Sequence, residues 1–104
     1  MNANVNAIYT NLKTFFATSF EGTYYHWLDS NYALVFCRDK DIIYGKVAYN
    51  DSALQCDFDF DWTMPYDEKR GEIYDTEVSI TCAKDIQWLI NEYEYMKKVG
   101  IIII

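Results

Sequence analysis

Proline, glycine, histidine and cysteine are all scarce in this sequence of 104 residues, which contains one proline, four glycines, one histidine and three cysteines. Because 51% of the residues are hydrophobic and proline and glycine are so few, the chain is neither intrinsically disordered nor of low complexity. The cysteines are odd in number and lack CxxC or metal-ligand spacing, which argues against a disulfide framework or a zinc site. Since Cys37, Cys56 and Cys82 lie in apolar stretches, we expect buried, reduced thiols in a cytoplasmic protein.

Positive charge and long apolar runs are also lacking. Nine Lys and Arg residues face sixteen Asp and Glu residues, which gives a formal net charge of −7. Such a chain should neither bind nucleic acid directly nor lie on an anionic membrane. No segment approaches the roughly 20 apolar residues of a membrane span, and the N-terminus lacks the basic region of a secretory signal.

Catalytic and cofactor motifs are absent as well. The sequence has no glycine-rich phosphate loop, serine elbow or cluster of His and Cys ligands, and we interpret its one histidine, His26, as a structural strand residue. A calcium-binding loop has acidic ligands at its positions 1, 3, 5 and 12, and this spacing is matched by Asp57, Asp59, Asp61 and Glu68. However, Trp62 occupies position 6, where that loop needs glycine. We therefore expect no enzyme activity, no catalytic residue, no cofactor and no metal.

The apolar pattern predicts one α+β domain over residues 1–104. Steps of three and four residues predict two helices, with apolar stripes at Val5, Ile8, Leu12, Phe15, Phe16 and Phe20 and at Ile86, Leu89, Ile90, Tyr93 and Met96. Between them, strand-like runs cover residues 23–28, 32–37, 42–49, 54–62 and 73–82. Their short connections favour an antiparallel five-stranded meander, because parallel crossovers need a dozen or more residues. We expect both helices on one face of the sheet and the C-terminal isoleucines as a candidate sixth strand.

The negative charge is concentrated in residues 51–77. This segment contains nine acids and only two bases, Lys69 and Arg70, so it alone accounts for the net charge of −7. Residues 1–50 and 78–104 are each neutral overall.

Within that segment, Asp57, Asp59 and Asp61 alternate with apolar residues and should share one face of a half-buried strand. If the strand over 73–82 lies beside it, the acidic field also takes in residues from that strand and from the loop between the two, namely Asp67, Glu68, Glu72, Asp75 and Glu77. Trp62 and Tyr66 lie among these acids as candidate interface anchors. An alternative interpretation is a solvated face whose charges keep a sheet edge from pairing.

Regularly spaced negative charge imitates a phosphate backbone. It predicts a non-enzymatic inhibitor that occupies the basic groove of a nucleic-acid-binding protein, such as a nuclease or CRISPR effector. The profile is similar to that of anti-CRISPR proteins, anti-restriction DNA mimics and nuclease-immunity proteins, a likeness that assigns no residue a role. The alternative is a small acidic interaction module or secretion-chaperone-like dimer, in which the homodimer contact would come from Ile101, Ile102, Ile103 and Ile104.

Overall fold

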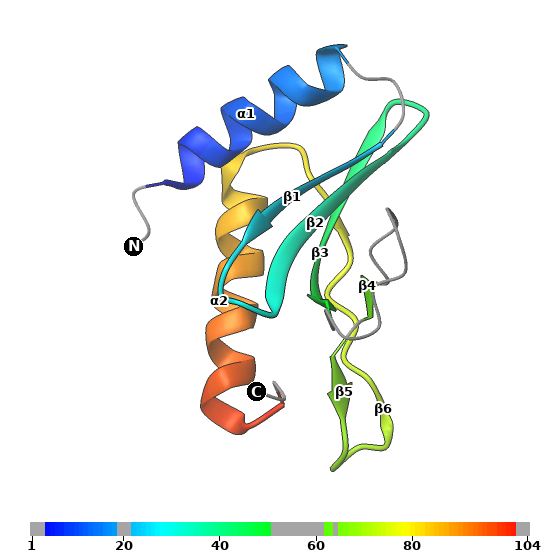
Figure 1. Ribbon diagram of the computed structural model, residues 1–104, viewed down its shortest axis with the longest axis vertical. Helices are drawn as coiled ribbons and strands as arrows, with labels where there is room; N and C mark the ends of the chain where they lie inside the picture. The colour runs from blue at the N-terminus through cyan, green and yellow to red at the C-terminus, as the bar shows by residue number, and fades with distance from the viewer. Residues whose placement is uncertain (1–3, 19–21, 51–61, 64, 102–104) are drawn as a thin grey trace.

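The computed structural model describes residues 4–18, 22–50, 62–63 and 65–101. One helix precedes all the strands along the chain and a second helix follows them (Figure 1). The elements are α1 (Val5–Thr18), β1 (Thr23–Trp27), β2 (Tyr32–Asp39), β3 (Ile42–Asn50), β4 (Trp62–Thr63), β5 (Tyr66–Asp67), β6 (Glu72–Ile73), β7 (Val78–Ser79) and α2 (Ala83–Val99). The predicted α+β class, with an N-terminal helix, an antiparallel sheet and a C-terminal helix on that sheet, is confirmed.

Strands β1, β2 and β3 form the main part of the sheet. They pair in antiparallel fashion in the order β1-β2-β3. His26 of β1 lies opposite Leu34 of β2, and Leu34 lies opposite Val47 of β3. The first five residues of β2 are buried, as expected for a central strand with apolar residues on both faces.

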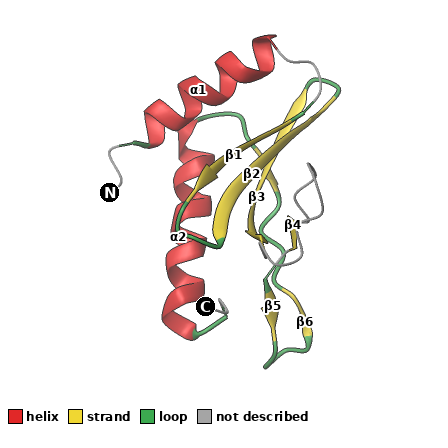
Figure 2. Ribbon diagram, viewed as in Figure 1, coloured by secondary structure: helices red, strands yellow, loops and turns green. Residues whose placement is uncertain are grey.

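Both helices pack on the same face of this sheet, as predicted. The main core joins Leu34 and Phe36 of β2 and Val47 of β3 to apolar side chains of α1 and α2, and Figure 2 shows the helices to one side of the strands. The predicted stripes are confirmed, because the buried residues are Val5, Ile8, Leu12 and Phe16 in α1 and Ile86, Leu89, Ile90, Tyr93 and Met96 in α2. Phe15 packs at the edge of this core, whereas Phe20 lies outside the described residues.

A glycine allows α2 to approach the sheet closely. Gly45 of β3 lies directly opposite Phe36. A Cβ atom at Gly45 would lie 2.8 Å from Cδ1 and Cε1 of Phe36 and 3.0 Å from Cδ1 of Leu89 in α2. The position opposite Phe36 therefore has no room for a side chain.

Helix α2 is closed at both ends by local hydrogen bonds. At its start, Asp85 Oδ2 accepts hydrogen bonds from the backbone N–H groups of Thr81 (2.8 Å) and Cys82 (3.2 Å). The bond from Thr81 is the largest influence on the pKa of Asp85, which lies below its usual value. At its end, Gly100 adopts a left-handed conformation with φ 79°, and Ile101 N–H donates to the carbonyl of Met96 at 2.9 Å.

Ile101 is buried in the core of its own chain. The other three isoleucines, at 102–104, lie outside the described residues. The sixth strand and the homodimer contact through Ile101, Ile102, Ile103 and Ile104 therefore stay predictions.

A polar clamp ties the turn between β1 and β2 to α2. Asp29 Oδ1 accepts hydrogen bonds from the backbone N–H groups of Asn31 (2.7 Å) and Tyr32 (2.8 Å). The Tyr93 hydroxyl of α2 donates to the second oxygen of Asp29. Burial opposes ionisation of Asp29, but these hydrogen bonds outweigh it and lower its pKa. Burial, followed by the bond to Asp29, raises the pKa of Tyr93.

The outer edge of β3 departs from a simple meander. Both β4 and β7 pair with β3, β4 at Tyr49 and Asn50 and β7 at Tyr44 and Gly45. Because β2 occupies the other edge of β3 along its length, β4 and β7 follow one another along the remaining edge. Of the strand expected over 54–62, only its last residue, Trp62, is described.

The strand expected over 73–82 is shorter than predicted, but its alternation is confirmed as far as Ile80. Thr76 and Ile80 are buried, whereas Asp75 and Glu77 are exposed. Within this stretch, Ile73 pairs in the hairpin β5–β6, and pairing with the main sheet is limited to Val78–Ser79. Cys82, expected to face inward, is exposed, because the chain has already left the sheet edge and turns into α2 there. The expectation of a buried thiol is therefore wrong for Cys82. Cys37 is half-buried, and Cys56 lies outside the described residues.

Candidate functional site

The structure describes the predicted acidic residues only in part. Asp57, Asp59 and Asp61 lie outside the described residues, so their expected common face stays a prediction. For the two candidate anchors the backbone is described: Trp62 pairs with Asn50 of β3, and Tyr66 pairs with Ile73 in the hairpin β5–β6.

The segment 63–72, expected to be a polar loop, contains β5 and the first residue of β6, and Asp67 holds the turn of this hairpin. Asp67 Oδ1 accepts hydrogen bonds from the backbone N–H groups of Lys69 (3.0 Å) and Arg70 (3.3 Å), and its own carbonyl accepts one from Gly71 (2.8 Å). Gly71 has φ 69°, a conformation that favours glycine. Because Asp67 is only 8% exposed, its carboxylate serves the turn more than the outer surface.

The other described acids of segment 51–77 face solvent. Glu68 and Glu72 are exposed on the hairpin, and Asp75 and Glu77 are exposed on the stretch that follows it. Asp75 Oδ1 also accepts a hydrogen bond from Glu77 N–H at 2.9 Å, which fixes the backbone between the two carboxylates. The described part of the acidic segment thus presents four carboxylates to solvent.

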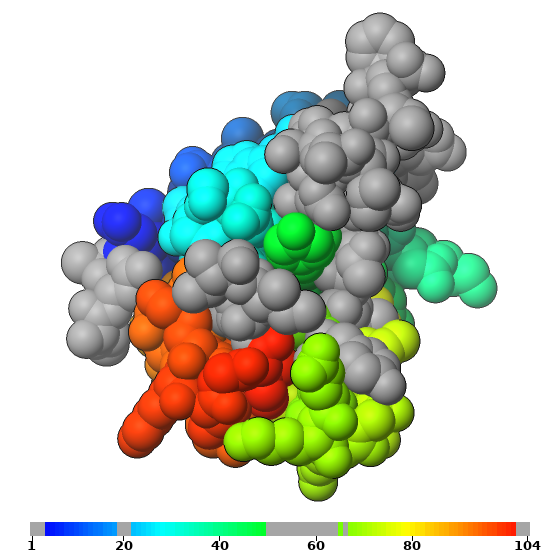
Figure 3. Space-filling model, turned by 60° about the horizontal axis from the view of Figure 1, so that its bottom comes forward, coloured from blue at the N-terminus to red at the C-terminus, as the bar shows by residue number. Residues whose placement is uncertain are grey.

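Three of the predicted acids line a hollow of about 380 Å³ together with residues of α2. In the space-filling view, the hairpin in yellow-green and the C-terminal part of α2 in orange and red lie side by side (Figure 3). We call this hollow the α2 groove, and its lining residues are Asp67, Arg70, Glu72, Ile73, Tyr74, Asp75, Trp88 and Glu92. Glu68 and Glu77 do not line it.

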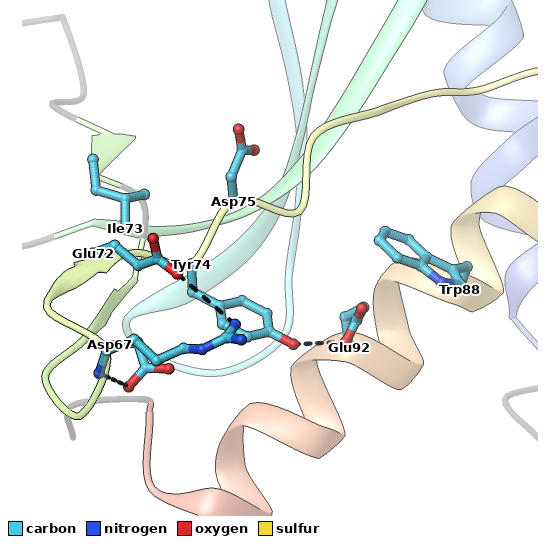
Figure 4. A pocket seen from close by; sticks show the side chains of 8 residues that line it. Asp67, Glu72, Ile73, Tyr74, Asp75, Trp88 and Glu92 are labelled. Carbon is cyan, nitrogen blue, oxygen red and sulfur yellow. Dashed lines mark hydrogen bonds and ion pairs between the residues drawn. The ribbon is translucent and has the colours of Figure 1, made fainter.

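Tyr74 bridges the two sides of the α2 groove. It comes from the segment after β6, and its hydroxyl donates to Glu92 Oε2 of α2 at 3.1 Å (Figure 4). Burial of Tyr74, followed by this bond and the negative charge of Glu92, raises the pKa of the phenol. The phenol therefore stays protonated at neutral pH and holds one oxygen of the Glu92 carboxylate in place.

The α2 groove is acidic, with four carboxylates and one guanidinium among its lining side chains. The guanidinium is that of Arg70, whose Nη1 lies 3.8 Å from Glu72 Oε1. These two side chains are 69% and 62% exposed, so the pair contributes little because water screens it.

Apolar side chains surround the same groove. Ile73 is 56% exposed and Trp88 is 41% exposed, although both are large apolar residues. Tyr95, one helical turn beyond Glu92, is also exposed, and its ring centroid lies 6.5 Å from that of Tyr74. Exposed aromatic residues beside polar groups are typical of protein-binding surfaces.

Sequence analysis missed the contribution of α2, because residues 78–104 are neutral overall. A signal was nevertheless present in the spacing. Trp88, Glu92 and Tyr95 follow the steps of four and three that place residues on one helix face, away from the buried stripe. Two aromatic residues at such positions mark a helix face that lies outside the core stripe.

Comparisons with protein-family models, with curated proteins and with solved structures found no match for this chain. Among residues 4–18, 22–50, 62–63 and 65–101, no three His, Cys, Asp or Glu side chains come together as metal ligands. In that same part of the chain, neither helix is long and apolar enough to cross a membrane. The function must therefore be argued from the charges and contacts of the described surface.

Proposed function

We propose that this chain is a non-enzymatic cytoplasmic inhibitor that binds a basic nucleic-acid-binding protein and blocks its nucleic-acid site. The targets we favour are nucleases and CRISPR effectors, which would make it an anti-CRISPR, anti-restriction or nuclease-immunity protein of a phage or mobile element. The observation that carries the proposal is the placement of the whole net charge of −7 in residues 51–77. The described acids of this segment, other than Asp67, are exposed, which supports this role.

The physical basis is electrostatic complementarity. A positively charged cleft that tracks a phosphate backbone also attracts carboxylates spaced along a surface, and such attraction speeds association and weakens with salt. The rest of the chain has no net charge, so the negative electrostatic field of the molecule arises mainly from residues 51–77. Orientation of the inhibitor toward a basic cleft would follow from this asymmetry.

The experiment is inhibition of DNA cleavage by a panel of purified enzymes: an RNA-guided CRISPR nuclease, a restriction endonuclease and a colicin-type nuclease domain. Two triple variants remove charge from the acidic segment; they are Asp57→Asn with Asp59→Asn and Asp61→Asn, and Glu68→Gln with Glu72→Gln and Glu77→Gln. A matched control removes three exposed carboxylates elsewhere, by Asp39→Asn, Asp41→Asn and Glu94→Gln.

We expect the wild-type chain to inhibit at least one enzyme in competition with DNA, and the inhibition constant to rise with salt. At least one acidic-segment variant should lose inhibition by about tenfold or more, the scale of one or two charge-assisted contacts. The control, with the same change in net charge, should retain it. Equal loss in all three variants, or no inhibition of any enzyme in the panel, contradicts the proposal.

A further inference from the structure

We infer that the α2 groove binds an arginine side chain of the partner, presented on a short segment with apolar neighbours. The inference rests on the proposed function in one respect, that the partner is basic. It goes further by naming a binding groove partly outside the acidic segment and the residue type that enters it.

The walls of the groove suit a flat cation. Figure 4 shows Tyr74 and Glu92 pointing toward one another, with Asp75 next to Tyr74 along the chain and Trp88 on α2 beside Glu92. The exposed indole of Trp88 offers a ring face, on which a guanidinium is favoured over an ammonium because it stacks as well as attracts. Carboxylates within the same hollow can accept its N–H groups.

The acceptors are already oriented before any partner binds. Tyr74 holds Oε2 of Glu92, and the backbone N–H of Glu77 holds Oδ1 of Asp75. A carboxylate has about four lone-pair sites, so each group keeps capacity for a further donor. Side chains that are fixed in advance lose less conformational entropy on binding, which favours a specific contact.

Apolar neighbours of the arginine would contact the rim. Ile73 on the hairpin side and Trp88 on the helix side are both exposed and line the hollow. Burial of such surface stabilises a complex by about 25 cal/mol per Å² before the costs of association. The occupant that matches both features is an arginine between two apolar residues, and a segment of consecutive basic residues matches only the charge.

Arg70 allows a test in which a substitution should strengthen binding to the α2 groove. It lines the same groove and forms a loose, exposed pair with Glu72, so its positive charge repels an incoming guanidinium. Removal of this charge should therefore strengthen binding. Removal of an equal charge at Lys40, in the distant turn between β2 and β3, should not.

The probe is the capped peptide acetyl-Leu-Arg-Leu-amide, titrated into the full 15N-labelled chain and followed by two-dimensional NMR. The comparison peptide has glutamine in place of arginine. Trp88→Phe assigns the Trp88 indole signal. The binding variants are Glu92→Gln, which keeps an acceptor for Tyr74, and Trp88→Ala; the matched control is Glu94→Gln on the same helix, exposed and outside the groove. Thermal melts establish that each variant folds.

We expect the arginine peptide to shift the Trp88 indole and the amides of Tyr74, Asp75 and Glu92, and the glutamine peptide to leave them unchanged. Glu92→Gln and Trp88→Ala should each weaken binding by at least about fivefold. Arg70→Gln should strengthen it by about twofold or more, whereas Lys40→Gln and Glu94→Gln should change it by less than twofold. Equal responses to Glu92→Gln and Glu94→Gln, or shifts spread over all acidic residues, overturn the inference.

The two proposals can fail separately. If the peptide binds as expected but no enzyme of the panel is inhibited, arginine binding in the α2 groove is supported and the proposed inhibitor function is refuted. If inhibition depends on the acidic segment but the peptide leaves the Trp88 signal unshifted, the proposed function is supported and arginine binding in the α2 groove is refuted.

Discussion

Thr76 completes the hydrogen bonding of β3 where strand pairing is interrupted. Along the outer edge of β3, β7 ends its pairing at Gly45 and β4 begins at Tyr49. Between these positions, the backbone N–H of Val47 donates to Thr76 Oγ1 at 2.9 Å. Thr76 is 1% exposed and Val47 is fully buried, so water is not an alternative partner for either group.

The substitution Thr76→Val removes the acceptor and keeps the shape of the side chain. An unpaired buried N–H costs about 1–3 kcal/mol, and each kcal/mol lowers the melting temperature by roughly 4–8 °C in a domain of about this size. Thr76→Ser, in contrast, keeps the hydroxyl and loses one methyl group, worth about 1 kcal/mol.

Urea unfolding followed by circular dichroism measures the free energy of unfolding, with an unchanged m-value as the sign that the folded state is intact. Amide hydrogen exchange of Val47 reports the bond itself. We expect that amide to lose protection in Thr76→Val and to keep it in Thr76→Ser. If Thr76→Val unfolds at the same urea concentration as the wild type and its Val47 amide stays protected, the hydroxyl does not have the role assigned to it here.

Three further outcomes follow from close contacts elsewhere in the fold. Gly45→Ala should destabilise the chain by about 1–3 kcal/mol through overpacking, and Phe36→Leu in the same background should recover part of that loss in urea unfolding. The lowered pKa of Asp29 stabilises the fold above its ordinary value near 3.8, and the raised pKa of Tyr93 does so below 10.0. The wild type should therefore lose stability on acidification through the folded pKa of Asp29 and on raising the pH above 10, and Tyr93→Phe should lose less in alkali; parallel pH profiles would contradict the clamp. Asp67→Ala should loosen the hairpin turn and speed amide exchange there, with a melting temperature close to that of the wild type; unchanged exchange would show that the carboxylate is dispensable.

The helices and the three long strands were predictable because each buries a face that repeats along the sequence. In α1 and α2, the apolar residues recur at three- and four-residue steps, and all of those described are buried or packed at the edge of the core. In β2, a continuous apolar run matches a strand buried on both faces. For such elements, local pattern and tertiary packing specify the same structure.

The hairpin was harder to predict, since β5 and β6 span two residues each and strands this short give no period-two pattern. The hairpin depends instead on the turn formed by Asp67 and Gly71, and segment 63–72 resembles an ordinary polar loop in composition. For β7 the alternation was visible in the sequence, but its short length was not. Beside β7, the hydroxyl of Thr76 takes the place of a strand hydrogen bond to β3. Only the folded chain brings Thr76 and Val47 together.

The same limit applies to the candidate site, and it changes how the charge of the molecule is understood. Summing charge along the chain identifies residues 51–77 but assigns nothing to α2, because Glu92 and Glu94 are balanced there by lysines. In the fold, Glu92 joins Glu72 and Asp75 around one hollow, and Trp88 of α2 adds an aromatic side chain to its lining. Field strength depends on distance in space, so a carboxylate on a helix without net charge can add as much to the groove as one in the acidic segment. A partner that enters the groove would then be selected by α2 as well as attracted by the hairpin, and neutralising residues 51–77 alone would leave part of that selectivity in place.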